Sequence, residues 1–243
     1  MSPGEEVPSP PLGTAPGTRA PQDAGTGQAT PGVASGKAGP VVSTPLSVAQ
    51  PVLRLITVII GWTAVLSNSI YGLFAPQFLG FGQPALSATY STAAALMIAT
   101  QLVFPRVVAR VGEHSACTLG LLAAAVGIGG QSLIRIQPLH SLLYMVNRVG
   151  AGVADTATAA LVARSSMGRE DRSRNLALLT STRAAARIVS PLLSSTLFQL
   201  SCTRGTMTPP GALPFVSAAC LALAAAPLPR LLAKAESDRD NES

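Results

Sequence analysis

Six apolar stretches follow one another along most of the chain, and each is about as long as a membrane-spanning helix. They are Leu55–Phe74, Leu86–Phe104, Ala116–Leu133, Leu142–Val162, Leu176–Leu200 and Gly211–Leu228. A helix needs roughly 18 to 20 apolar residues to cross about 30 Å of hydrocarbon. Buried helices of a large soluble core are the alternative, and six such stretches with few charges argue against it. The pattern predicts an all-α membrane protein with six transmembrane helices over residues 51–235.

The two ends of the chain do not share this pattern. Residues 1–50 contain no Phe, Tyr, Trp or Ile and consist mainly of Pro, Gly, Ala, Ser and Thr. Such a segment buries too little apolar surface to offset the entropy lost on ordering, so a disordered tail is predicted there. Residues 236–243 are polar, and a second disordered tail is predicted for them.

The composition supports the membrane assignment. Charged residues make up 12% of the chain, about half of the roughly 25% found in soluble proteins. The net charge of +6 does not indicate a nucleic-acid partner, because the basic residues lie between apolar stretches rather than on one solvated face. Cys117, Cys202 and Cys220 lie far apart. Their spacing is typical of neither disulfides nor metal sites, so no metal or cofactor is expected.

The basic residues also predict an orientation in the bilayer. If the first helix starts in the cytoplasm, nine basic residues flank the spans on that side and two on the other. The nine are Arg54, Arg106, Arg110, Arg164, Arg169, Arg172, Arg174, Arg230 and Lys234; the two are Arg135 and Arg204. This imbalance follows the positive-inside rule and predicts that both termini are cytoplasmic.

Four ionisable residues lie inside the predicted spans: Arg148, Asp155, Arg183 and Arg187. A charge at membrane depth costs at least roughly 2.5 to 3.5 kcal/mol, so each should face a partner or a wet cavity. Arg183 is expected to reach toward the cytoplasmic interface, whereas Arg187 lies near the middle of its span. We therefore expect Asp155 to pair with Arg187, either as a structural ion pair or as part of a transport site.

Other polar or helix-bending residues accompany these charges. Pro191 should bend the fifth helix and free the carbonyl of Arg187. Asn68 and Tyr71 place polar groups in the first helix. The first, second, fourth and fifth helices carry such groups, whereas the third and sixth are almost purely apolar. The first set is therefore expected to share a wet interior face.

Enzyme signatures are missing from the sequence. It contains no GxSxG, HExxH or Walker-type motif, and both histidines, His114 and His140, are expected in loops. No enzymatic activity is therefore expected.

Three segments resemble motifs of the major facilitator superfamily. The loop at residues 105–114 is similar to its G-x-x-x-D-R-x-G-R-R pattern, with Arg110 and Gly112 matching. The pattern is not kept at Pro105, Ala109, Glu113 and His114. Arg148 and Gly152 match an R-x-x-x-G pattern in the fourth helix. Residues 186–195 resemble the antiporter-type G-x-x-x-G-P-x-x-G-G, with Pro191 kept and small residues at the glycine positions.

The resemblance covers about residues 53–233 and implies one six-helix half of such a transporter, with features of the C-terminal half. It implies secondary active transport of a small organic solute, such as a drug or an anion, by alternating access and proton-coupled antiport. A second six-helix half would be needed, from another copy or from a missing part of the protein. Arg148, Asp155, Arg187, Asn68 and Tyr71 would then serve substrate or proton coupling, and Arg110 and Gly112 a cytoplasmic gate. The alternatives are a non-transporting membrane remnant or interaction scaffold, and a small channel.

Overall fold

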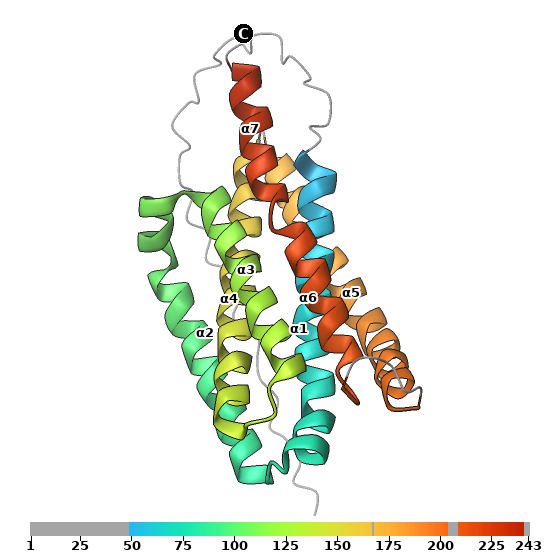
Figure 1. The fold of residues 1–243 in the computed structure, drawn as a ribbon. Coiled ribbons are helices and arrows are strands. Elements are labelled where there is room, and N and C mark those ends of the chain that lie inside the picture. The colour runs from blue at the N-terminus through green and yellow to red at the C-terminus, as the bar shows by residue number, and fades with distance from the viewer. Residues whose placement is uncertain (1–48, 167, 204–208, 241–243) are drawn as a thin grey trace, which may run out of the picture. The chain divides into compact units, whose positions relative to one another are not determined.

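The protein is helical throughout the part of the chain that the computed structural model describes, which is residues 49–166, 168–203 and 209–240. The helices are α1 (Ala49–Leu79), α2 (Gln83–Val111), α3 (Glu113–Leu133), α4 (Gln137–Arg164), α5 (Arg169–Thr203), α6 (Leu213–Ala225) and α7 (Leu228–Asp240). Helices α1 to α6 run up and down side by side (Figure 1). No strand occurs among these residues. The all-α prediction is confirmed.

The first five predicted stretches each lie within one helix, and the sixth covers α6 and reaches α7. Four segments of the described chain are long and apolar enough to cross a membrane: Gln50–Leu79, Gln83–Val111, Glu113–Leu133 and Leu213–Ala235. Helices α4 and α5 are long enough but more polar, and they are not among these four. The structure is consistent with an integral membrane protein, while the number of six spans stays a prediction.

Proline and glycine mark the helix boundaries. Pro84, Pro138 and Pro214 occupy the first turns of α2, α4 and α6, where a missing N–H breaks no helical hydrogen bond. Gly112 joins α2 to α3 with a φ of 79°, a conformation that L side chains rarely adopt. Pro227 lies in the turn that separates α6 from α7. These positions mark where one helix ends and the next begins.

Side-chain contacts tie together the helix ends that carry most of the basic residues, which we call the basic end. Arg164 at the end of α4 lies 3.8 Å from the carboxylate of Glu113, the first residue of α3. Gln50 Nε2 donates to Ser165 Oγ at 2.9 Å, which joins α1 to the turn after α4. His114 Nδ1 lies 2.9 Å from the carbonyl oxygen of Pro229 in α7. These contacts hold the starts of α1, α3 and α7 to neighbouring elements.

The opposite end of the bundle is held by two loop contacts. Gln137 Nε2 donates to the carbonyl of Leu79 at 2.5 Å. Arg135 donates to the carbonyl of Pro210 at 3.1 Å, and its guanidinium lies over the rings of Phe74 and Phe78, 4.7 and 5.5 Å from their centroids. Partial burial lowers the pKa of Arg135 below its ordinary value. These contacts bring the α1–α2 and α3–α4 connections and the start of the α6 segment together.

The closest helix crossing is that of α3 with α4, and glycines make it possible. A Cβ on Gly127 would lie 2.5 Å from the backbone nitrogen of Asn147, and one on Gly150 would lie 2.5 Å from that of Ala124. A Cβ on Gly120 would lie 2.6 Å from the backbone nitrogen of Ala154. Side chains at these positions would force the two backbones apart, so the crossing depends on small residues.

The buried apolar side chains form two clusters along the bundle axis. One contains Leu53 to Ile60 of α1 and Ala154 to Val162 of α4 and lies toward the basic end. The other contains Leu66 to Leu79 of α1 and Tyr144 of α4 and lies toward the opposite end. The level between Ile60 and Leu66 therefore separates two packed regions.

The predicted tails fall largely outside this description. Of residues 1–50, only 49 and 50 are described, and they begin α1. At the other end, α7 continues through Asp240, into the segment for which disorder was predicted from residue 236. The first part of α7 packs on the core through Leu228 and Leu232, which gives the helix an anchor before its polar part.

Candidate functional site

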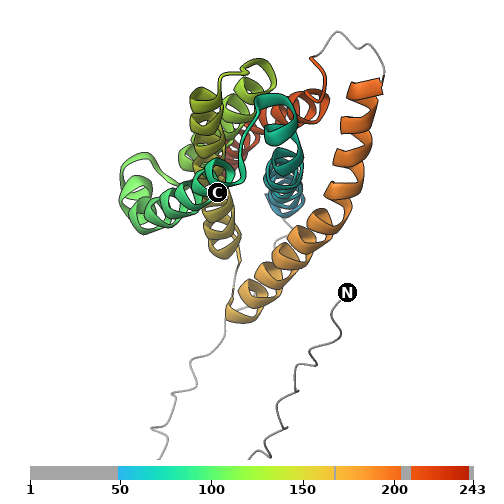
Figure 2. The same ribbon diagram turned by 90° about the horizontal axis from the view of Figure 1, so that it is seen from below.

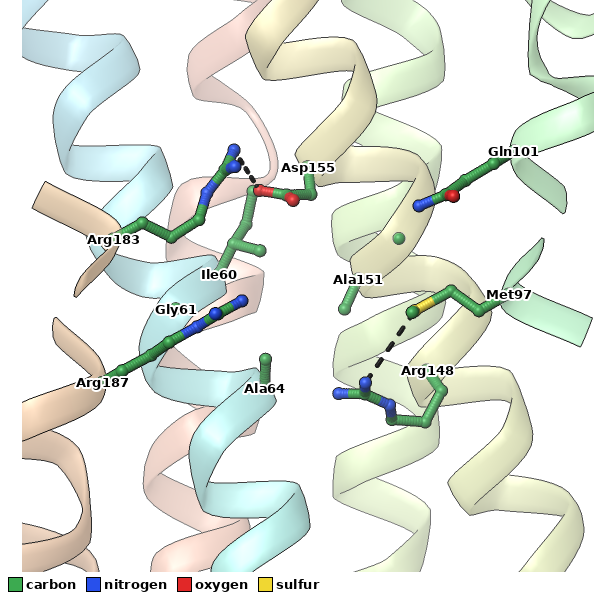
Figure 3. A pocket seen from close by; sticks show the side chains of 11 residues that line it. Ile60, Gly61, Ala64, Met97, Gln101, Arg148, Ala151, Asp155, Arg183 and Arg187 are labelled. Atoms are coloured by element: carbon green, nitrogen blue, oxygen red, sulfur yellow. Dashed lines mark hydrogen bonds and ion pairs between the residues drawn. The ribbon is translucent and has the colours of Figure 1, made fainter. Parts of the chain in front are cut away.

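A pocket at mid-height in the bundle brings the charged residues together (Figure 3). Its walls come from α1, α2, α4 and α5, the four helices whose polar residues were expected to share an interior face. They are Ile60, Gly61 and Ala64 of α1, Met97 and Gln101 of α2, Arg148, Ala151, Gly152 and Asp155 of α4, and Arg183 and Arg187 of α5. The pocket encloses about 470 Å³ of space outside atoms, part of it open to the surroundings.

The pocket lies near the middle of each contributing helix. Ala64 is at the centre of α1, Met97 at the centre of α2, and Arg187 one residue beyond the centre of α5. Ala151 is one of the two central residues of α4. The pocket also falls at the level between the two apolar clusters. It is therefore as far from either end of the bundle as the helices allow.

Asp155 forms an ion pair with Arg183 across the gap between α4 and α5. Arg183 Nη2 lies 2.5 Å from Asp155 Oδ1, and the two side chains are 22% and 34% exposed. The expected partner, Arg187, is one turn further along the same face of α5. That expectation was wrong because Arg183, and not Arg187, lies level with Asp155 in the bundle (Figure 3). Arg187 still contributes an electrostatic attraction to Asp155.

Arg148 and Arg187 do not meet a carboxylate within hydrogen-bonding distance among the described residues. Arg148 Nη2 approaches the sulfur of Met97 at 3.8 Å, and a thioether is a weak acceptor. Arg187 extends from α5 into the pocket on the side of Ala64 (Figure 3). The pocket thus contains three guanidinium groups and one carboxylate, so two positive charges are unbalanced.

Pro191 is the internal proline of α5, and this helix changes direction along its length (Figure 2). Because proline lacks an N–H, the carbonyl of Arg187 loses its usual helical partner. Two nearby serines bond to other carbonyls of the same helix. Ser190 Oγ donates to the carbonyl of Ala186 at 2.5 Å, and Ser195 Oγ to that of Leu192 at 2.9 Å. Neither serine bonds to the carbonyl of Arg187.

Asn68 and Tyr71 lie outside the pocket, in an aromatic cluster toward the opposite end. The hydroxyl of Tyr144 donates to Asn68 Oδ1 at 2.7 Å. The ring of Tyr71 is completely buried, with the ring centroid of Tyr144 4.3 Å away and that of Tyr90 6.0 Å away. These two predicted site residues therefore belong to a packed region on one side of the pocket.

His140 belongs to the same cluster, which corrects its predicted place in a loop. It lies in the first turn of α4, is fully buried, and stacks on Phe74 with centroids 5.5 Å apart. Its Nε2 lies 3.1 Å from the carbonyl oxygen of Gln131. His114 is likewise helical, in the first turn of α3. The loops between the first four helices are shorter than the apolar pattern indicated because these helices extend beyond their apolar stretches.

The predicted gate residues Arg110 and Gly112 lie at the basic end. Arg110 is exposed in the last turn of α2, where a cation interacts favourably with the helix dipole. A Cβ on Gly112 would meet no atom within 4 Å, so its positive φ rather than crowding requires glycine. Both are about three turns of α2 away from the pocket.

The three guanidinium groups of the pocket are hydrogen-bond donors suited to electrostatic recognition. No group of three or more His, Cys, Asp or Glu side chains in the described part of the chain is placed to hold a metal ion. Sequence reasoning found the four charges, whose rarity in apolar stretches is a strong signal. It missed Met97 and the small residues of α1, because nothing distinguishes them from ordinary lipid-facing or packing residues.

Comparisons of the chain with protein-family models, curated proteins and solved structures find no match.

Proposed function

We propose that the protein is a secondary active transporter of a small organic solute, exchanged for protons by alternating access. The observation that carries this proposal is the charged pocket at mid-height between α1, α2, α4 and α5. A binding site near the bilayer midplane is what alternating access requires, because either side must reach it in turn. The resemblance of the 105–114, 148–152 and 186–195 segments to major facilitator motifs supports the same proposal.

The proposal includes six membrane spans, with α4 and α5 crossing the bilayer beside the four more apolar segments. Their charges are then directed into a shared pocket, where an ion pair and water lower the cost of membrane depth. The protein would work with a second six-helix half, supplied by another copy of this chain or by further sequence. That half would close the open side of the pocket.

The decisive experiment is uptake by vesicles containing the purified protein, with a panel of organic cations, organic anions, sugars and amino acids. An imposed pH gradient should drive concentrative, saturable uptake of at least one solute. Asp155→Asn should abolish this coupled uptake, because the pocket loses its only carboxylate. Glu170→Gln is the matched control: Glu170 is an exposed acid in the first turn of α5, outside the pocket, and its variant should transport normally.

Size-exclusion chromatography and thermal unfolding of Asp155→Asn must show a folded protein before its uptake is interpreted. Unchanged uptake in folded Asp155→Asn would contradict the coupling role of that residue. Lack of flux with every solute would contradict transport by this chain alone or as paired copies, and would favour the non-transporting scaffold. Single-channel currents without saturation would favour a channel.

A further inference from the structure

We propose that the pocket binds the anionic group of a small organic molecule, a carboxylate or a phosphate ester, between the guanidinium groups of Arg148 and Arg187. This inference rests on the proposed transport function and adds the chemical class of the solute. It begins from the charge imbalance of the pocket, where three arginines face one aspartate.

The single carboxylate is already engaged. Asp155 Oδ1 is 2.5 Å from Arg183, so Arg183 and Asp155 largely neutralise each other. The partner of Arg148 is a methionine sulfur at 3.8 Å, and that of Arg187 is a more distant attraction to Asp155. Arg148 is half-buried, and Arg187 is exposed on the open side of the pocket. At the proposed membrane depth their unbalanced charges are costly, and binding of an anion lowers that cost.

The two arginines are arranged to hold one ligand from opposite sides. Arg148 extends from α4 and Arg187 from α5, and both enter the space beside Ala64 (Figure 3). A planar guanidinium donates two parallel hydrogen bonds to a carboxylate or phosphate, which gives orientation as well as charge. The anionic group would therefore lie between α4 and α5, on the Ala64 side of the Asp155–Arg183 pair.

The remaining walls indicate an organic rather than a fully polar ligand. Ile60, Gly61, Ala64 and Ala151 line the pocket with small or apolar surface, and Gln101 adds one amide. Small residues leave room for a ligand body, and one amide fixes its orientation without requiring many polar groups.

The test measures binding rather than flux. The purified protein in phosphatidylcholine nanodiscs is equilibrated with radiolabelled benzoate or inorganic phosphate, with tetraphenylphosphonium as a cationic probe and glucose as a neutral one. We expect saturable binding of at least one anion and none of the cation or the sugar. Lack of saturable anion binding, or equal binding of the cation, would overturn the proposal.

Variants locate the binding. Arg148→Gln and Arg187→Gln should each weaken anion binding about tenfold or more, the loss expected for a charged hydrogen-bonding partner. Arg187→Lys should restore part of that loss. Asp155→Asn should tighten binding several-fold, because it frees Arg183. Arg174→Gln, an exposed arginine of α5 outside the pocket, is the control and should bind as the wild type does. Unchanged affinity in both pocket variants would contradict the assignment.

A second lipid composition separates a soluble anion from a lipid headgroup. Phosphatidylglycerol in the nanodiscs should leave anion binding saturable and close to its original affinity. Loss of binding in that lipid would make the headgroup the bound anion and overturn the solute assignment. Anion binding without vesicle uptake would leave this inference standing and contradict transport. Uptake of only neutral or cationic solutes would contradict this inference alone.

Discussion

Asp155 pairs with Arg183 rather than with Arg187 because Arg183 lies at its level in the bundle (Figure 3). The two arginines are four residues apart and share one face of α5, so both are directed toward α4. Arg187 lies one turn further from the basic end and extends into the space beside Ala64. The charge of Arg183 is therefore balanced by Asp155, whereas the guanidinium of Arg187 has no paired carboxylate among the described residues.

A double-mutant cycle tests whether Asp155 interacts more strongly with Arg183 than with Arg187. Asp155→Asn, Arg183→Gln and the double variant should give a coupling free energy of about 1 to 3 kcal/mol in unfolding measurements, because the pair is partly buried. The matched cycle of Asp155 with Arg187 should give a clearly smaller value, since that attraction acts over a longer distance. The reverse order of the two coupling energies would assign Asp155 to Arg187.

Residue-level prediction succeeded for the charges and failed for their geometry. Arg148, Asp155, Arg183 and Arg187 stand out because charges are rare in apolar stretches. Their pairing depends on rotamers and on helix rotation, which spacing does not determine. Asn68 and Tyr71 share the polarity of pocket residues, yet they lie about one and two turns beyond Ala64 along α1, at the level of the aromatic cluster.

At the level of helices, the α3–α4 crossing is the contact most sensitive to volume. Gly150→Ala should destabilise the protein by about 1 to 3 kcal/mol, because the new methyl group would lie 2.5 Å from the backbone nitrogen of Ala124 and force the helices apart. Unfolding in mixed detergent micelles measures the change. Gly168→Ala is the control, because a Cβ there meets nothing within 4 Å and its stability should not change. Equal stability of both variants would mean that the helices separate at little cost.

The helices themselves were largely predictable, because apolar length is a direct signal. Their true ends were not, since α2, α4 and α5 extend by polar turns beyond the apolar stretches. Those turns carry contacts such as Glu113 with Arg164 and Gln137 with the carbonyl of Leu79, which join elements distant in sequence. A pattern read along one chain does not reveal which helix end meets which.

For the whole bundle, the basic end is predicted to face the cytoplasm. In a Cys220→Ser background, Cys202, exposed near the end of α5, should react with a membrane-impermeant maleimide only from the non-cytoplasmic side of oriented membranes. In a Cys202→Ser, Cys220→Ser background, Gly168→Cys, in the turn before α5, should react only from the cytoplasmic side. Cys117 is buried and should stay unlabelled in the folded protein. Labelling of Cys202 from the cytoplasmic side and of position 168 from the other side would mean that the orientation is the reverse of the one proposed.

The surplus of positive charge in the mid-height pocket should also affect the passage of inorganic cations. Fixed guanidinium groups at mid-height in the bundle repel sodium and potassium, as positive charges do in some selective pores. An unloaded protein would therefore resist electrical leakage of cations even while the pocket is hydrated. The arginines proposed to bind an anionic solute would also prevent cations from crossing the membrane when no solute is bound.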